Sequence, residues 1–201
     1  LNRDCRKEGG SRLLKLGILA LQGDYYKHRK ILEYLGVNCI DVRYIEDLSS
    51  CTALIIPGGE STTLTTLIQR NNFYDALVEY GKTNPVFGTC AGLIMMSDSV
   101  NDPRIKSLKY IDITAERNGW GRQVHSFNVP VNLNWKNGKP FNAMFIRAPK
   151  ITRYSKSVKV LADVNGEPVL VQENKFLAST FHPELVEDYR VHQYFIDMIN
   201  G

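Results

Sequence analysis

The thiol of Cys90 stands in the sequence context that most clearly suggests chemistry. It lies in Gly88-Thr89-Cys90-Ala91-Gly92, which follows one short apolar run and precedes another. A G-x-C-x-G turn between a strand and a helix predicts a nucleophile elbow at the carboxyl end of a sheet, where flanking glycines avoid clashes. The N-terminus of the following helix favours the thiolate. The motif indicates covalent catalysis by cysteine, with a buried cysteine in a glycine-bounded turn as the alternative.

A histidine and a glutamate two residues apart could activate this thiol. Phe181-His182-Pro183-Glu184 follows the last strand-like run of the chain. In an extended segment both side chains face the same way, so Glu184 could accept the Nδ1–H of His182 and direct its Nε2 toward Cys90. Alone, the segment could equally be a strand-end histidine beside a solvated glutamate. Together with the elbow, it favours a Cys-His-Glu triad.

The first half of the chain predicts a scaffold that could bring these residues together. Apolar runs ending in turns alternate with segments of helical periodicity, which indicates parallel strands with helices on both faces of a sheet. The expected strands are 16–21, 37–44, 53–56 and 85–87. Helices are expected after Asp24, which could cap the first of them, from Ser61 or Thr62, from Asn72 and after Cys90.

The second half is richer in strands. Strand-like segments are 111–114, 124–133, 143–147, 158–164, 169–172 and 176–181, and apolar residues at helical spacing predict a terminal helix. We therefore expect a three-layer, flavodoxin-like α/β sandwich, with a mostly parallel central sheet, helices on both faces and an added antiparallel strand region. Residues 1–14 are interpreted as an N-terminal extension, and 15–201 as one domain.

Composition excludes several other classes of protein. Among 201 residues, 43% are hydrophobic and 23% charged, and the net charge is only +4. The basic residues are scattered, which argues against nucleic acid as a partner, and no apolar run is long enough to cross a membrane. The cysteines lack C-x-x-C spacing, so no metal site is expected. His28, His125 and His192 are interpreted as surface or internally satisfied histidines.

Several segments resemble one family of enzymes. The elbow and His-Pro-Glu are similar to those of class I (triad) glutamine amidotransferases, and the chain more closely resembles the PdxT/SNO family, the glutaminase subunits of pyridoxal 5′-phosphate synthase. The segments run in family order from about residue 16 to the end of the chain. The more specific ones are Pro57-Gly58-Gly59-Glu60-Ser61-Thr62-Thr63, Arg117-Asn118 followed by Gly121-Arg122-Gln123, and Phe145-Ile146-Arg147-Ala148-Pro149.

This resemblance implies a reaction and a set of site residues. The implied reaction is hydrolysis of L-glutamine to L-glutamate and ammonia through a glutamyl thioester on Cys90. The N–H groups of Gly59 and Ala91 would form the oxyanion hole. Substrate contacts carry over to Gly58, Gly59, Glu60, Arg117, Ile146 and Arg147. Ser61 is explained at least as well by a helix cap as by a substrate contact. The sequence does not indicate which arginine holds the substrate's α-carboxylate.

The resemblance also implies a partner protein. Ammonia would pass to a separate synthase subunit, a PdxS/SNZ-like (β/α)₈ barrel in a large hetero-oligomer, for vitamin B6 biosynthesis. Gln22 resembles the part of the family that meets the synthase. The glutaminase would stay idle until docked, and Gly59 tolerates both peptide orientations of the oxyanion loop. No cofactor is implied, and free thiols suggest a cytoplasmic enzyme.

Three alternatives remain open at this stage. The chain could supply ammonia to another synthase, such as one for histidine or purine biosynthesis. It could be a cysteine hydrolase or isomerase on a similar elbow, although such proteins generally lack the late His-Pro-Glu segment. It could also be a regulator that binds the synthase without turnover, against which the intact triad argues.

Overall fold

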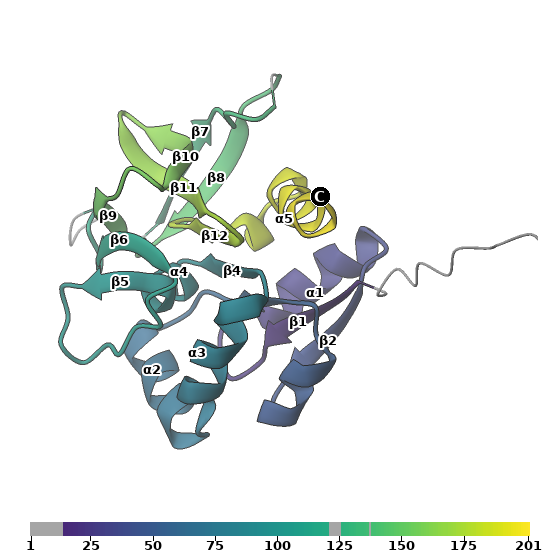
Figure 1. Ribbon diagram of the computed structural model, residues 1–201. Coiled ribbons are helices and arrows are strands. Elements are labelled where there is room, and N and C mark those ends of the chain that lie inside the picture. The colour runs from purple at the N-terminus through teal and green to yellow at the C-terminus, as the bar shows by residue number, and fades with distance from the viewer. Residues whose placement is uncertain (1–13, 121–125, 137) are drawn as a thin grey trace, which may run out of the picture.

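A largely parallel sheet runs through the middle of the computed structural model, which describes residues 14–120, 126–136 and 138–201 (Figure 1). Within these residues seven strands have the order β10-β11-β12-β4-β3-β1-β2. They are β1 (Lys15–Leu19), β2 (Asn38–Val42), β3 (Ala53–Ile56), β4 (Val86–Thr89), β10 (Lys159–Val164), β11 (Glu167–Glu173) and β12 (Phe176–Ser179). β12, β4, β3, β1 and β2 pair in parallel, whereas β11 and β10 add an antiparallel edge.

Helices cover both faces of this sheet, as expected from the alternating pattern. α1 (Tyr25–Tyr34) and α5 (Arg190–Asn200) lie on one face, and α2 (Ser61–Arg70), α3 (Phe73–Thr83) and α4 (Ala91–Met96) lie on the other. β3 shows why both faces are apolar. Ala53 and Ile55 enter the core beneath α1 and α5, whereas Leu54 and Ile56 enter the core beneath the other three helices.

Two smaller sheets complete the layers. The hairpin of β7 (Ser126–Val131) and β8 (Phe141–Ile146) is antiparallel and packs on the α5 side. β5 (Ser97–Val100), β6 (Ile111–Glu116) and β9 (Lys150–Tyr154) form the other sheet on the α4 side. The sequence did not predict β5 or β9, because Ser97-Asp98-Ser99 and Lys150 to Tyr154 carry few apolar residues. The 3₁₀ turns η1 (Ile45–Ser50) and η2 (Pro183–Leu185) complete the elements of the described chain.

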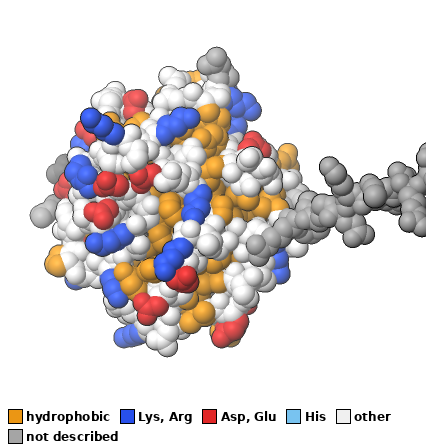
Figure 2. All heavy atoms as spheres, viewed as in Figure 1, with side chains coloured by type: hydrophobic (Ala, Val, Ile, Leu, Met, Phe, Trp, Pro, Cys, Tyr) orange, Lys and Arg blue, Asp and Glu red, His pale blue; other side chains and the backbone are white. Residues whose placement is uncertain are grey.

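The surface mixes charges of both signs. On the face drawn in Figure 2, basic and acidic side chains are interspersed around a band of apolar side chains. Residues 1–13 of the expected N-terminal extension lie outside the described residues. In the described part of the chain, none of the helices is both long and apolar enough to cross a membrane.

The sheet topology gathers the predicted site residues at one edge. Gln22 follows the end of β1, Gly58 follows β3, Cys90 follows β4, and His182 follows β12. These four strands are parallel, so their carboxyl ends meet at the same edge, where open α/β sheets bind ligands. Arg147 reaches the same region from the end of β8. Pairing of β12 with β4 is the step that places the histidine segment beside the cysteine.

Candidate active site

Cys90 sits in a strained turn between β4 and α4. Its φ of 49° and ψ of −101° are unfavourable for a residue with a side chain. A Cβ at Gly88 would lie 2.6 Å from the carbonyl carbon of Gly92, and a Cβ at Gly92 would lie 2.0 Å from the Ile56 oxygen. The prediction that both flanks must be glycine is therefore confirmed. The Cys90 N–H donates to the Ser179 oxygen at 2.8 Å, which anchors the elbow to β12.

His182 and Glu184 meet, but through a different backbone from the one expected. Residues Pro183–Leu185 form the 3₁₀ turn η2, so the predicted extended segment is wrong. The bend brings His182 Nδ1 to 2.7 Å from Glu184 Oε1. Both side chains are almost fully buried. The backbone N–H of His182 donates to the backbone oxygen of Met144 at 2.8 Å. Glu184 can thus fix the Nδ1–H form of the imidazole.

Burial and neighbouring charges shift the pKa of His182 in opposite directions. Burial lowers the pKa of His182, because it disfavours the charged imidazolium. The hydrogen bonds and negative charges of Cys90 and Glu184 outweigh this effect and raise the pKa of His182 to about 10. A protonated imidazole favours the thiolate of a neighbouring cysteine. The structure therefore places the buried His182-Glu184 pair beside Cys90, and Cys90 and His182 line the same pocket.

The loop after β3 packs against this group. A Cβ at Gly58 would lie 2.5 Å from His182 Cε1, so glycine is needed for the close approach. Gly59 has φ 141°, a conformation that residues with side chains rarely adopt, and a Cβ there would lie 2.5 Å from the Gln22 amide. Gln22 Oε1 accepts the Glu60 N–H at 3.3 Å. Gln22 thus lies against the predicted oxyanion loop.

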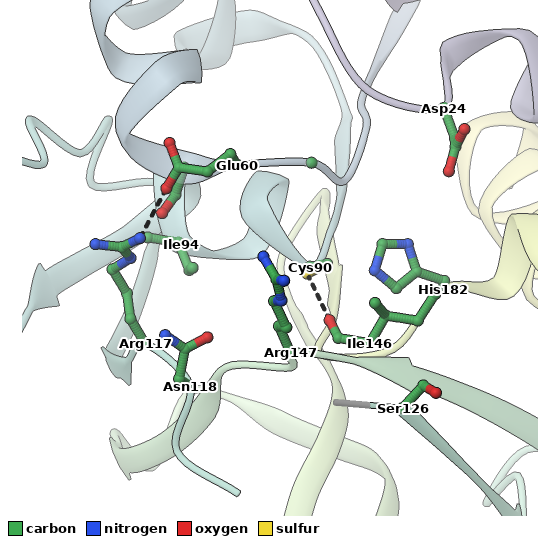
Figure 3. Close-up of a pocket in the computed structure, with 12 residues that line it drawn as sticks. Asp24, Glu60, Cys90, Ile94, Arg117, Asn118, Ser126, Ile146, Arg147 and His182 are labelled. Carbon is green, nitrogen blue, oxygen red and sulfur yellow. Dashed lines mark hydrogen bonds and ion pairs between the residues drawn. The ribbon is translucent and has the colours of Figure 1, made fainter. Parts of the chain in front are cut away.

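A pocket of about 560 Å³ opens beside the thiol and the imidazole (Figure 3). Residues expected to contact the substrate line it: Gly59, Glu60, Arg117, Ile146 and Arg147. Arg147 extends toward Cys90 in Figure 3, and the Cys90 sulfur lies 3.9 Å from the Ile146 oxygen. Gly58 packs on His182 and is absent from the described lining of this pocket.

An ionic network forms one wall of the pocket. Arg117 pairs with Glu60 at 2.7 Å and with Asp102. The Glu60 carboxylate also accepts the N–H groups of Thr62 and Thr63, so Glu60 caps α2 and the expectation of a Ser61 cap is wrong. Burial raises the pKa of Glu60, but the hydrogen bonds from these threonines lower it to about 2. Glu60 is therefore a fixed negative charge at neutral pH.

Sequence reasoning missed several residues of the pocket. Asp24, Ile94, Asn118 and Ser126 also line it, as does Ser61, for which a substrate contact was one of two interpretations. Asp24 occupies the N-cap position of α1, but its side chain makes no capping hydrogen bond among the described residues. Asn118 was quoted within a family segment, yet its φ of 52° could not be read from residue type alone. Arg122 and Gln123 lie outside the described residues.

Comparisons with known proteins decide the family. A model of the SNO glutamine amidotransferase family matches residues 18–201. The chain belongs to this family. It is 45% identical over 189 residues to pyridoxal 5′-phosphate synthase subunit PdxT of Thermotoga neapolitana, covering 92% of this chain and 100% of the relative. The subunit of the same name from Thermosipho africanus is 46% identical over 187 residues, which cover 92% and 99% of the two chains.

Solved structures agree on the fold. A crystal structure of a glutamine amidotransferase superposes with a TM-score of 0.86 at 40% identity, covering 92% of this chain and 99% of that one. The structure of PurLQS from Thermotoga maritima gives a TM-score of 0.68 at 13% identity, covering 92% and 98%. The second likeness shows the fold alone. The expected mostly parallel α/β sandwich is confirmed. Within the described residues, no group of three or more His, Cys, Asp and Glu side chains could hold a metal ion.

Proposed function

We propose that this protein hydrolyses L-glutamine to L-glutamate and ammonia with a Cys90-His182-Glu184 triad, and that the ammonia passes to a synthase subunit that makes pyridoxal 5′-phosphate. The position of the strained Cys90 next to His182, whose pKa is raised to about 10, carries the proposal. It lies on the wall of a pocket large enough for an amino acid. The names of the relatives support the synthase as the destination.

In the first half of the reaction, the Cys90 sulfur attacks the carbon of the substrate's side-chain amide. The carbonyl oxygen becomes negative and accepts hydrogen bonds from backbone N–H groups. The candidate donors are Ala91, at the start of α4, and Gly59. The carbon–nitrogen bond then breaks. His182 gives the proton on Nε2 to the departing nitrogen, and ammonia leaves behind a glutamyl thioester.

In the second half, water replaces ammonia. Neutral His182 accepts a proton from the water as its oxygen attacks the thioester carbon. The carbon–sulfur bond breaks, glutamate leaves, and the thiolate and the imidazolium are restored. Glu184 stabilises the charged imidazole at each stage through its bond to Nδ1.

The two arginines of the pocket differ in availability. Arg117 already pairs with Glu60 and Asp102. Arg147 extends into the pocket and makes no hydrogen bond or ion pair with the described residues. We therefore assign the substrate's α-carboxylate to Arg147, and its ammonium group to Glu60, whose low pKa keeps it charged. Ile146 and the Gly58-Gly59 loop would enclose the side chain between them.

The contacts of Gln22 support control by a partner. Gln22 packs on Gly59, and a Cβ at Gly23 would lie 1.8 Å from the Gly58 oxygen, so the segment after β1 touches the oxyanion loop directly. A synthase barrel docking on Gln22 would move this segment and let the Gly59 peptide turn its N–H into the pocket. Since a catalytic thiol needs a reducing compartment, we also propose that the complex is cytoplasmic.

A coupled assay tests this function. Glutamate release is measured with wild type and with Cys90→Ser, each with and without the candidate synthase barrel. We expect slow turnover by the isolated protein, a large increase on adding the barrel, and none with Cys90→Ser. Equal turnover with and without the barrel would reject the coupling. Glutaminase activity that rises only with a histidine or purine synthase would support that alternative destination.

A further inference from the structure

Two histidines that the proposed mechanism does not use are buried directly behind the triad. His28 on α1 has none of its surface exposed, and His192 on α5 has 1% exposed. The sequence suggested surface or internally satisfied side chains, so a surface position is wrong for both, and His125 lies outside the described residues. Buried imidazoles with few polar partners are costly, so their arrangement needs an explanation.

The two rings connect the core to the second oxygen of the triad glutamate. His28 Nε2 lies 3.5 Å from Glu184 Oε2 and 3.3 Å from the Thr89 hydroxyl. On the other side of the ring, His28 Nδ1 lies 2.9 Å from His192 Nε2. Glu184 Oε2 is buried without a hydrogen bond among the described residues, and so is His192 Nδ1. The contacts form a line from α5 through α1 to the triad.

Both rings are neutral. Burial lowers the pKa of His28 well below its usual range, and the nearby positive charge of His182 acts in the same direction. Burial lowers the pKa of His192 to about 3. A neutral imidazole carries one N–H, so each ring donates at one nitrogen and accepts at the other.

One arrangement of these protons fits the contacts. Glu184 is an acceptor when ionised, so the proton of His28 belongs on Nε2, where it faces the carboxylate and the Thr89 hydroxyl. His28 Nδ1 then accepts, and the N–H of His192 must lie on Nε2. His192 Nδ1 is left as a bare acceptor, in agreement with its lack of a donor among the described residues. The opposite arrangement would point a lone pair of His28 at a buried negative charge.

We propose that His28 is a positioning residue for the triad, holding Glu184 Oε2 so that Oε1 stays directed at His182, and that His192 fixes the tautomer in which His28 acts. This inference rests on the proposed function of the triad. Glu184 Oε1 is bonded to His182 at 2.7 Å, and Oε2 faces His28 Nε2 at 3.5 Å. Without His28, Oε2 loses this facing polar group, and the carboxylate can rotate away from Nδ1.

Kinetics with the synthase present test the role. His28→Leu removes the donor while keeping a buried side chain, and we expect kcat to fall about 10- to 100-fold, as for other residues that orient a histidine ligand, with KM within about threefold. His28→Gln keeps an N–H donor near the position of Nε2 and should recover most of the loss. If His28→Gln is as impaired as His28→Leu, or if His28→Leu keeps wild-type kcat, the inference is wrong.

A second measurement does not depend on glutamine hydrolysis. The rate of alkylation of Cys90 by iodoacetamide is followed against pH at the peptide level, so that the other cysteines do not interfere. The groups facing His28 are Glu184 from η2, His182 directly before η2, His192 from α5, and Thr89 beside Cys90. Weaker support of His182 disfavours the thiolate, so the His28→Leu profile should move to higher pH. An unmoved profile would overturn the inference even if wild type proves inactive on glutamine.

Two variants separate positioning from general destabilisation. Leu32→Ala removes a fully buried side chain from the same helix that is neither a triad member nor one of the two histidines, and should leave both the kcat and the alkylation profile unchanged. A shift in that control equal to the His28→Leu shift would show a merely structural role. If His28→Leu does not fold, His192→Leu takes its place, with a smaller shift expected in the same direction.

Nitrogen-15 NMR should find His28 and His192 as neutral Nε2–H tautomers, and Nδ1–H tautomers would contradict the assignment.

Discussion

The floor and the rim of the pocket are built in different ways. At the floor, Cys90, His182 and Glu184 are 4 to 6% exposed, and backbone hydrogen bonds hold Cys90 to β12 and His182 to β8. At the rim, the Glu60 side chain is 46% exposed and Arg117 is 21% exposed. The rim residues belong to loops and a helix end, and ion pairs hold them rather than a packed core.

This difference separates chemistry from its control. A buried triad keeps its geometry because displacing any member would disturb well-packed neighbours. Loops with exposed hydrogen bonds open at a lower free-energy cost. Under the proposed function, the protein can therefore keep its nucleophile formed while the oxyanion loop waits for a partner. Changes at the floor should abolish chemistry, whereas changes at the rim should alter affinity or coupling.

The largest effect is expected from Cys90→Ala. Without a nucleophile, glutamate release should fall on the order of 10⁴-fold or more, as for other covalent catalysts that lose theirs. Binding to the synthase, measured by analytical ultracentrifugation, should survive because the rim is unchanged. Cys39→Ala is the matched control, since this half-buried thiol lies at β2, and it should keep full activity. Full turnover by Cys90→Ala would remove the triad from the mechanism.

Glu184→Gln should lower kcat about 10²- to 10⁴-fold, because the neutral amide no longer stabilises imidazolium. The shift of the His182 pKa to about 10 depends partly on this carboxylate. Its loss lowers the His182 pKa, so the alkaline limb of the kcat/KM profile should move to lower pH. If the alkaline limb does not move, it reports the titration of a group other than His182.

The same pKa predicts how stability depends on pH. The pKa of His182 is raised in the folded protein from an ordinary 6.5 to about 10. Protonated His182 therefore stabilises the fold fully below about pH 6.5, and this contribution is lost as pH rises toward 10. Urea denaturation should show the stability difference between wild type and Glu184→Gln shrinking over that range.

Gly59→Ala tests the rim. A Cβ at φ 141° is strained and would collide with Gln22. Synthase-stimulated turnover should fall about 10²- to 10³-fold if this N–H completes the oxyanion hole. Alkylation of Cys90 should be unaffected, because the floor is untouched. Gly138→Ala is the matched control for strain, with φ 137° and no atoms within 4 Å of the added Cβ. Similar losses in both variants would point to strain alone.

Arg147→Met should raise the KM for glutamine about 10- to 100-fold, the loss expected for a hydrogen-bonded charge pair with the α-carboxylate. kcat should change little, since Arg147 binds the α-carboxylate and not the leaving nitrogen in the proposed pose. Arg117→Met should have the smaller effect on KM, because Arg117 already has two carboxylate partners. The reverse ranking would exchange the roles of the two arginines.

The smallest effect is expected from Asp102→Asn. Asp102 holds Arg117 through an ion pair at the rim, and such pairs contribute little, so KM should rise only about two- to fivefold. Asp98→Asn is the control, because Asp98 pairs with Arg153 away from the pocket. A loss of kcat in Asp102→Asn would mean that the network acts on the floor as well.

Much of the fold and the central chemistry followed from local patterns. Apolar runs indicated β1, β3 and β4, and glycines around Cys90 predicted the elbow, because steric limits act between neighbouring residues. The pairing of His182 with Glu184 was also predicted, but for the wrong reason: an extended strand was assumed, and a 3₁₀ turn achieves it. Spacing in sequence indicates which residues could meet, and the backbone path between them depends on tertiary contacts.

The sequence by itself determined the alternating α/β layers, the strained cysteine and the identity of the residues that could serve it. Only the tertiary structure decided that β12 lies beside β4, that Gln22 rests on Gly59, and that His28 and His192 stand behind Glu184. Each of these contacts joins segments far apart in the chain. No local preference specifies such contacts, because they form when whole elements bury their apolar faces against the sheet.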